Sequence, residues 1–95
     1  MTDTTTLLRR EAALPDGPAA AAVLLEPLLS EAAGGATRVS LTLDYGVEAA
    51  PGEPTTIEAW VDRATRTLVF AHGRLIRTSD QVLIASGSAV FAREA

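Results

Sequence analysis

Hydrophobic and polar residues alternate along the C-terminal third of the chain, which is the pattern of strands with one buried face. The alternation runs through residues 68–76, stops at the polar segment RTSDQ at positions 77–81, and resumes through residues 82–91. A short polar segment between two alternating runs predicts a β-hairpin of two long antiparallel strands. The positions expected to share one face are Val69, Ala71, Gly73, Leu75, Leu83, Ala85, Gly87, Ala89 and Phe91. The positions expected on the opposite face are Leu68, Phe70, His72, Arg74, Ile76, Val82, Ile84, Ser86, Ser88 and Val90.

Two further alternating segments precede the hairpin. RVSLTLDY at positions 38–45 and IEAWVDRA at positions 57–64 each predict one strand, and the stretch between them carries two prolines and two glycines, which is typical of a loop. The apolar residues expected to face inward are Val39, Leu41, Leu43 and Tyr45 in the first strand and Ile57, Ala59 and Val61 in the second. The residues of the first strand expected to face outward are Arg38, Ser40, Thr42 and Asp44.

One long helix is expected before these strands. The segment AAAAVLLEPLLSEAAGG at positions 19–35 is apolar on nearly every side, so the helix is expected to be buried, and Gly34 and Gly35 are expected to end it. Pro27 removes one backbone hydrogen bond and clashes with the preceding turn, so it is expected to kink the helix or to split it in two.

The segment PDGP at positions 15–18 favours a break followed by a helix start. Pro18 suits the first helical position, and Asp16 or Gly17 suits a position at or before the cap. Upstream of this break, LLRREAAL at positions 7–14 fits either a short edge strand or one or two helical turns.

The sheet offers the helix a place to pack. Small residues at Ala71, Gly73, Gly87 and Ala89 line one face of the hairpin, and such residues let a helix approach the sheet closely. His72 alternates with these residues and is expected on the opposite face, in a structural or interfacial role. The element order therefore predicts an α+β domain in which one apolar helix packs against an antiparallel sheet of at least four strands.

Composition narrows the possible functions. Ninety-five residues predict one domain over positions 1–95, with the polar residues 1–6 expected to be disordered. The chain has no cysteine and one histidine, so no disulfide framework, zinc site or other cofactor is expected. A net charge of −4 argues against a nucleic-acid partner.

The hydropathy of the chain predicts no membrane partner. The longest apolar run, at residues 18–29, is interrupted by Glu26 and Pro27 and is too short to span a bilayer. The start MTDTTTLLRREAAL lacks the pattern of a signal peptide, so a cytoplasmic location is expected. All eight basic residues are arginine, which fits the codon bias of a GC-rich bacterial genome.

Residues 36–91 resemble the hotdog fold, and in particular the acyl-CoA thioesterases of the phenylacetate-degradation type. RVSLTLDY is similar to the strand that follows the helix in that family, and AWVDRATRTLVFAHGRLIRTSDQVLIASGSAVF is similar to its last three strands. The resemblance implies a hotdog-like fold that binds or hydrolyses an acyl-CoA thioester. It also implies a homodimer or homotetramer, because hotdog dimers usually join sheet edges and larger assemblies bury the other surfaces.

The helix differs from the family pattern. The His-Gly-Gly turn that usually precedes it is missing, and two alignments place the usual carboxylate differently. Alignment on the strands places it within Ala19–Ala22, whereas alignment on the helix start, with Gly17 at the turn, places it near Glu26. The sequence is compatible with both alignments.

Thioester hydrolysis needs a donor for the developing oxyanion and a carboxylate that activates water or attacks the carbonyl. N–H groups at the helix start near Gly17 can supply the donor. Asp16 and Glu26 are the candidate carboxylates, although a helix cap and a solvated or paired surface acid are the simpler interpretations. Because nine helical residues span about 13 Å, we expect Glu26 to act across a dimer interface near Gly17 of the partner, as the family does with its two subunits.

Other residues are candidates for substrate binding. Arg63 and Arg66 lie in a predicted turn and could meet the phosphates of coenzyme A, although solvated turn charges are the simpler interpretation. Asp44 and Tyr45 could line a pocket in a neighbouring subunit or pack at an interface as a strand end. The sequence thus predicts an acyl-CoA thioesterase-like protein, with a catalytically degenerate hotdog module that binds a thioester or serves assembly as the alternative.

Overall fold

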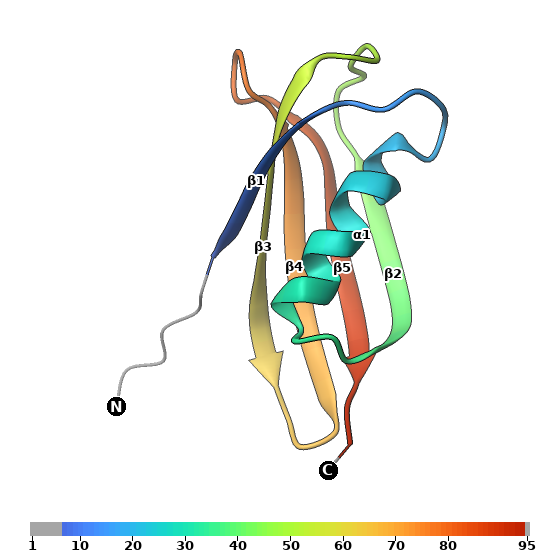
Figure 1. Cartoon of the computed structure of the whole chain (residues 1–95), viewed down its shortest axis with the longest axis vertical. Helices are drawn as coiled ribbons and strands as arrows, with labels where there is room; N and C mark the ends of the chain where they lie inside the picture. Colours follow the sequence, from blue (N-terminus) through green and yellow to red (C-terminus); the bar gives the residue numbers. More distant parts are fainter. Residues whose placement is uncertain (1–6, 95) are drawn as a thin grey trace.

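The structure, a computed structural model, describes residues 7–94, so the expected disorder of residues 1–6 lies outside the described part. The chain forms β1 (Leu8–Ala13), α1 (Ala20–Ala32), β2 (Thr37–Tyr45), β3 (Pro54–Ala64), β4 (Leu68–Arg77) and β5 (Leu83–Ala92). The strands form one antiparallel sheet in the order β1-β3-β4-β5-β2, and α1 lies across one face of it (Figure 1). The predicted α+β architecture is confirmed, and segment 7–14, left open by the sequence, supplies a fifth strand at the edge.

The helix packs where the sheet carries its smallest residues. Leu25 and Leu29 of α1 are completely buried, and a Cβ built on Gly73 of β4 would lie 3.3 and 3.2 Å from their methyl groups. Gly73 therefore faces the helix, as the alternation predicts, and its neighbour His72 lies on the opposite face. Such close approach lets the two leucines fill a thin core without larger residues on the sheet.

We expect Gly73→Ala to destabilise the fold more than Gly87→Ala does. The new Cβ at position 73 would lie 2.9 Å from the backbone oxygen of Glu58, which cannot move aside, whereas at position 87 it meets only side-chain methyl groups of Leu43, Leu29 and Leu41 at 3.3 to 3.6 Å. Overpacking of this kind costs about 1–3 kcal/mol, and the cost at position 87 should be smaller because the leucine side chains around it can shift. Urea unfolding of both variants measures the difference, and equal free energies of unfolding would contradict this account of the packing.

The helix differs from its prediction at the start and along one side. It begins at Ala20, after an N-cap at Ala19 that has no side-chain cap, so Pro18 is not the first helical residue and Asp16 caps nothing. Gly17, with φ of 99°, turns the chain just before it, and the amide of Ala20 donates to the carbonyl of Gly17 at 3.3 Å. The predicted start at Pro18 is wrong because the two residues after Gly17 still belong to the turn, and the helix begins only at Ala20.

Two further features of α1 correct the sequence-based expectation. The helix runs through Pro27 without splitting, because Leu25, Leu28 and Leu29 on both sides of the proline pack against the sheet. It is also not buried all round, since Val23 remains 55% exposed on the outer side.

The register of the sheet changes at three places, and at two of them the β-bulge reverses side-chain orientations expected from the sequence. In β2 the register changes between Arg38 and Ser40, which places Arg38 opposite the buried Phe91 and therefore on the helix side, contrary to expectation. In β5 the register changes beside Leu83, which is 41% exposed, whereas Ile84 is buried in the core, so the expected orientations of these two residues are reversed. An extra residue in a strand breaks the period of two, and its position is not visible in the hydropathy pattern.

No helix between residues 7 and 94 has both the length and the apolar character needed to cross a membrane.

Candidate functional site

The start of α1 faces a cavity of about 420 Å³. The cavity is lined by Gly17, Ala20 and Ala21 on one side and by the chain from Tyr45 to Ala49 on the other. Within residues 7–94 the amides of Ala21 and Ala22 have no hydrogen-bond acceptor, and no acidic residue occupies the first turn. An uncapped helix start with free N–H groups offers positive potential to a carbonyl or carboxylate oxygen in this cavity.

Glu26 lines a second, smaller cavity of about 200 Å³ between α1, β2 and β5. Its floor consists of the apolar residues Leu29, Leu41, Ala89 and Phe91. The Glu26 side chain is 39% exposed, and its Oε2 accepts a hydrogen bond of 3.0 Å from Nη1 of Arg38. Glu26 is therefore a carboxylate held at the mouth of an apolar cavity by an arginine that the β2 bulge turns toward the helix.

Within one chain the two candidate half-sites are separated. The helix-start cavity lies at the Tyr45 end of β2, and the Glu26 cavity lies at the Arg38 end. Asp16 is exposed and lines neither cavity, so only its position beside Gly17 keeps it near the helix start.

Arginines gather at the end of the sheet that carries the Glu26 cavity. Arg63 pairs with Phe70 one position before the end of β3, and Arg66 is exposed in the following turn. Arg93, after β5, donates from its guanidinium to the carbonyl of Thr65 in the same turn. Sequence reasoning selected Arg63 and Arg66, which line no cavity themselves, and missed Arg38 and Arg93, which only the β2 bulge and the strand register bring to this end.

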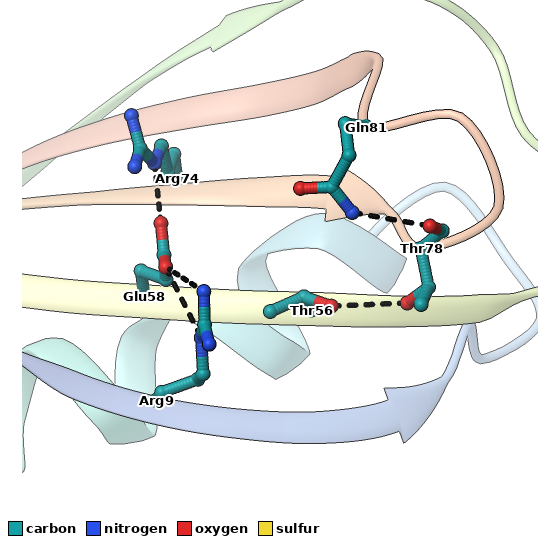
Figure 2. Close-up of polar contacts among 6 residues, drawn as sticks. All are labelled: Arg9, Thr56, Glu58, Arg74, Thr78 and Gln81. Carbon is teal, nitrogen blue, oxygen red and sulfur yellow. Dashed lines mark hydrogen bonds and ion pairs between the residues drawn. The ribbon is translucent and has the colours of Figure 1, made fainter.

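The opposite face of the sheet carries a polar cluster that belongs to neither cavity. Glu58 of β3, with a side chain only 3% exposed, accepts hydrogen bonds from Arg74 of β4 and from Arg9 of β1, the latter at 2.9 Å (Figure 2). Nearby, Trp60 stacks on His72 with ring centroids 5.4 Å apart. The cluster ties β1, β3 and β4 together, which is a structural role.

His72, Ser88 and Asp62 do not form a catalytic triad. The Ser88 hydroxyl lies 3.2 Å from Nδ1 of His72, and the Asp62 carboxylate lies 3.6 Å from the same nitrogen. A triad needs the serine and the acid on different ring nitrogens, so that the ring can take a proton from one while being held by the other. Within the described residues no group of three His, Cys, Asp or Glu side chains could hold a metal ion.

We expect Glu58 to make stability depend on pH. The hydrogen bond from Arg74 is the largest effect on its pKa, and together with Arg9 it holds the pKa below the usual range despite burial. A carboxyl whose pKa is lower in the folded state stabilises the fold fully above its unfolded pKa of about 4.3, and this contribution is lost as pH falls through the folded pKa.

The variant Glu58→Gln checks this expectation. At pH 7 it should lower the free energy of unfolding by about 1.5–3 kcal/mol, the range for hydrogen bonds to a charged group. The gap between wild type and variant should close as the pH falls below about 4, as measured by thermal or urea unfolding across pH. A gap that stays constant down to pH 2 would contradict the assignment.

Comparison with solved structures supports the fold. Thioesterase superfamily member 2 of zebra fish is 22% identical, covers 97% of this chain and 78% of its own, and gives a TM-score of 0.82. The phenylacetic acid degradation protein PaaI of Thermus thermophilus is 14% identical, covers 94% of this chain and 84% of its own, and gives a TM-score of 0.78. A protein of Streptococcus mutans solved with acetyl-CoA bound is 10% identical, covers 95% of this chain and 82% of its own, and gives a TM-score of 0.74.

The sequence itself matches a family model. No curated protein matches the chain significantly. The model described as "Thioesterase superfamily" matches residues 19–84, which span α1, β2, β3, β4 and the start of β5. This match covers more than half of the chain and includes both candidate half-sites from Ala19 onward. The chain has the hotdog fold and belongs to the thioesterase superfamily.

Proposed function

We propose that this protein hydrolyses an acyl-CoA thioester at a site shared by two copies of the chain. One observation carries the proposal: two complementary half-sites, an uncapped helix start and a carboxylate beside an apolar cavity, lie at opposite ends of one edge strand, β2. Neither half-site is complete within one chain, because the two cavities share no lining residue: one lies at the Tyr45 end of β2 and the other at the Arg38 end.

The edge formed by β2 is suited to pairing with another strand. β2 has nine residues, and Val39 and Tyr45 along it are 58% and 67% exposed. The other edge strand, β1, has only six residues and exposes the charged run of Arg9, Arg10 and Glu11. Short, charged edges resist pairing, whereas long edges with exposed apolar residues favour it.

A second copy of the chain is the partner that β2 fits best. The strand carries Arg38 near its start and Asp44 near its end, so antiparallel pairing of two copies brings the positive end of each strand beside the negative end of the other. A two-fold axis through the middle of β2 makes this contact self-complementary. Such pairing also places the Glu26 cavity of each chain beside the helix-start cavity of its partner.

The chemistry follows from this assembly. The thioester carbonyl oxygen lies at the N–H groups after Gly17 of one chain, where the helix dipole stabilises the developing negative charge. Glu26 of the other chain takes a proton from water, whose oxygen adds to the carbonyl carbon. The C–S bond then breaks, the coenzyme A thiolate is protonated, and the carboxylic acid leaves.

The remaining candidates have subordinate roles in this proposal. Arg63 and Arg66 bind the phosphates of coenzyme A at the arginine-rich end of the sheet. Asp16, next to the helix start, is the second candidate carboxylate. No cofactor is required, because water, one carboxylate and backbone donors suffice for the reaction.

A hydrolysis screen tests the proposal. Short, long and aromatic acyl-CoAs are incubated with the protein, and release of the coenzyme A thiol is followed while calorimetry measures coenzyme A binding in parallel. Thiol release from at least one class supports hydrolysis. Binding without release from any class would favour the non-catalytic acyl-thioester-binding alternative, and absence of both would overturn the proposal.

A further inference from the structure

Tyr45 is a large exposed side chain that the proposed chemistry does not use. It is the only tyrosine of the chain and the last residue of β2, and it is 67% exposed. Its partner across the β2–β5 ladder is Ala85, which is completely buried in the core. Residues directly opposite in a ladder point to the same face, so Tyr45 lies on the helix side of the sheet, where it borders its own helix-start cavity.

Pairing of two β2 strands would carry Tyr45 to the Glu26 cavity of the other chain. Gly46 donates its N–H to Ile84 of β5, and hydrogen-bonding directions alternate along a strand, so the N–H groups of Leu41, Leu43 and Tyr45 are directed to the open edge. Helix-side residues must face helix-side residues across the two-fold axis. Axes at positions 41, 42 and 43, at or near the middle of β2, satisfy this condition.

All three registers have the same consequence for Tyr45. They set it opposite residue 39 or 41 of the other chain, which line the Glu26 cavity, or opposite residue 37, the neighbour of the lining residue Arg38. The aromatic ring is thus brought to the open side of that cavity in every case.

We propose that Tyr45 of the partner subunit covers the Glu26 cavity and sets the size of the acyl group it accepts. The cavity holds only about 200 Å³ and is apolar at its floor, so an aromatic ring across its open side completes an apolar pocket for a short acyl chain. This inference rests on the proposed thioester hydrolysis and its β2 dimer. It adds the residue that determines specificity and assigns it to the opposite chain.

Tyr45→Ala tests the specificity. For a short acyl-CoA we expect KM to rise about tenfold with little change in kcat, since the lost contact serves binding and not bond cleavage. For longer acyl chains the ratio kcat/KM should rise relative to the short one. Leu83→Ala, which removes an exposed apolar side chain on the opposite face of the sheet, is the matched control and should leave the acyl-chain profile unchanged. An unaltered profile in Tyr45→Ala would overturn the proposal.

Mixing two variants tests whether Tyr45 acts from the opposite chain. When Tyr45→Ala and Glu26→Gln chains are refolded together, half of the dimers are hybrids, and each hybrid contains one site with both native residues. For a tenfold defect in Tyr45→Ala, mixing should raise kcat/KM about fivefold above the average of the unmixed variants. No increase would show that Tyr45 acts within its own chain and would overturn this inference, while an active wild type would leave the proposed function standing.

A readout independent of activity covers the case of an inactive wild type. Protein labelled with 3-fluorotyrosine has a single ¹⁹F signal, because Tyr45 is the only tyrosine. That signal should shift between the wild type and the variant Ser40→Lys/Thr42→Lys, whose two lysines on the β2 edge are expected to prevent pairing of the two chains, and again when Glu26→Gln is introduced into the dimer. A signal insensitive to both changes would overturn the placement of Tyr45, whether or not hydrolysis is detected.

Discussion

Glu26→Gln should abolish thioester hydrolysis while leaving the dimer intact. The amide has the shape of the carboxylate and still accepts the hydrogen bond from Arg38, but it cannot take a proton from water. General-base catalysis contributes about 10²- to 10⁴-fold, so kcat should fall by at least about 100-fold. Thiol release under saturating acyl-CoA measures the loss, and light scattering measures the subunit composition.

Glu31→Gln provides the matched control for this variant. Glu31 lies on the same helix, but it is exposed and paired with Arg10 on the β1 side, away from the proposed site. The hydrolysis rate of Glu31→Gln should stay within about twofold of wild type, because an exposed ion pair contributes little to the stability of the fold. If Glu26→Gln retained the wild-type rate as well, the catalytic role of Glu26 would be wrong and the non-catalytic interpretation would be favoured.

The double variant Ser40→Lys/Thr42→Lys should convert the dimer into a folded monomer without hydrolytic activity. Both positions are exposed on the face of β2 away from the helix; Ser40 borders the Glu26 cavity, but neither residue belongs to the core or bonds to Glu26. With the two-fold axis at position 41 or 42, lysines of the two chains would stand opposite one another, and lysine on an edge strand opposes pairing in any register. Because each monomer keeps only half of the site, hydrolysis should fall by about 100-fold or more, as for loss of the base itself.

Light scattering, circular dichroism and thiol release check the three parts of that result. Ser79→Lys/Gln81→Lys adds the same charge in the β4–β5 turn and should leave both the mass and the rate unchanged. A folded monomer with full activity would contradict a site shared by two chains.

Much of this fold could be predicted because the sequence follows a period of two with few exceptions. Small residues at positions such as Gly73 and Gly87 identified the face on which the helix packs, and that prediction is confirmed. β1 remained open because only Leu8 and Ala12 of its six residues are even partly buried, which gives too weak an alternation to distinguish a strand from a helical turn.

Only those parts of the candidate site that lie in or next to the helix segment could be predicted from the sequence. The break at Gly17 and the carboxylate at Glu26 can be found from the helix alone. The Arg38–Glu26 ion pair cannot be found in this way, because it depends on a β-bulge that turns the Arg38 side chain to the other face of the sheet. The two ends of β2 point to a shared site only when β2 is known to be an edge strand of the sheet. The order of the strands depends on pairing between segments far apart in the sequence, so the sequence pattern does not reveal it.

A crystal structure of Glu26→Gln with a short acyl-CoA bound tests the shared thioester site most directly. The measurement is the distance from the thioester carbonyl oxygen to the backbone amides after Gly17, together with the chain from which each group comes. We predict a distance of about 2.7–3.2 Å to an amide of one chain, with the side chain at position 26 of the other chain within reach of the carbonyl carbon through one water. A thioester bound away from both groups, or held by both groups of the same chain, would contradict the account.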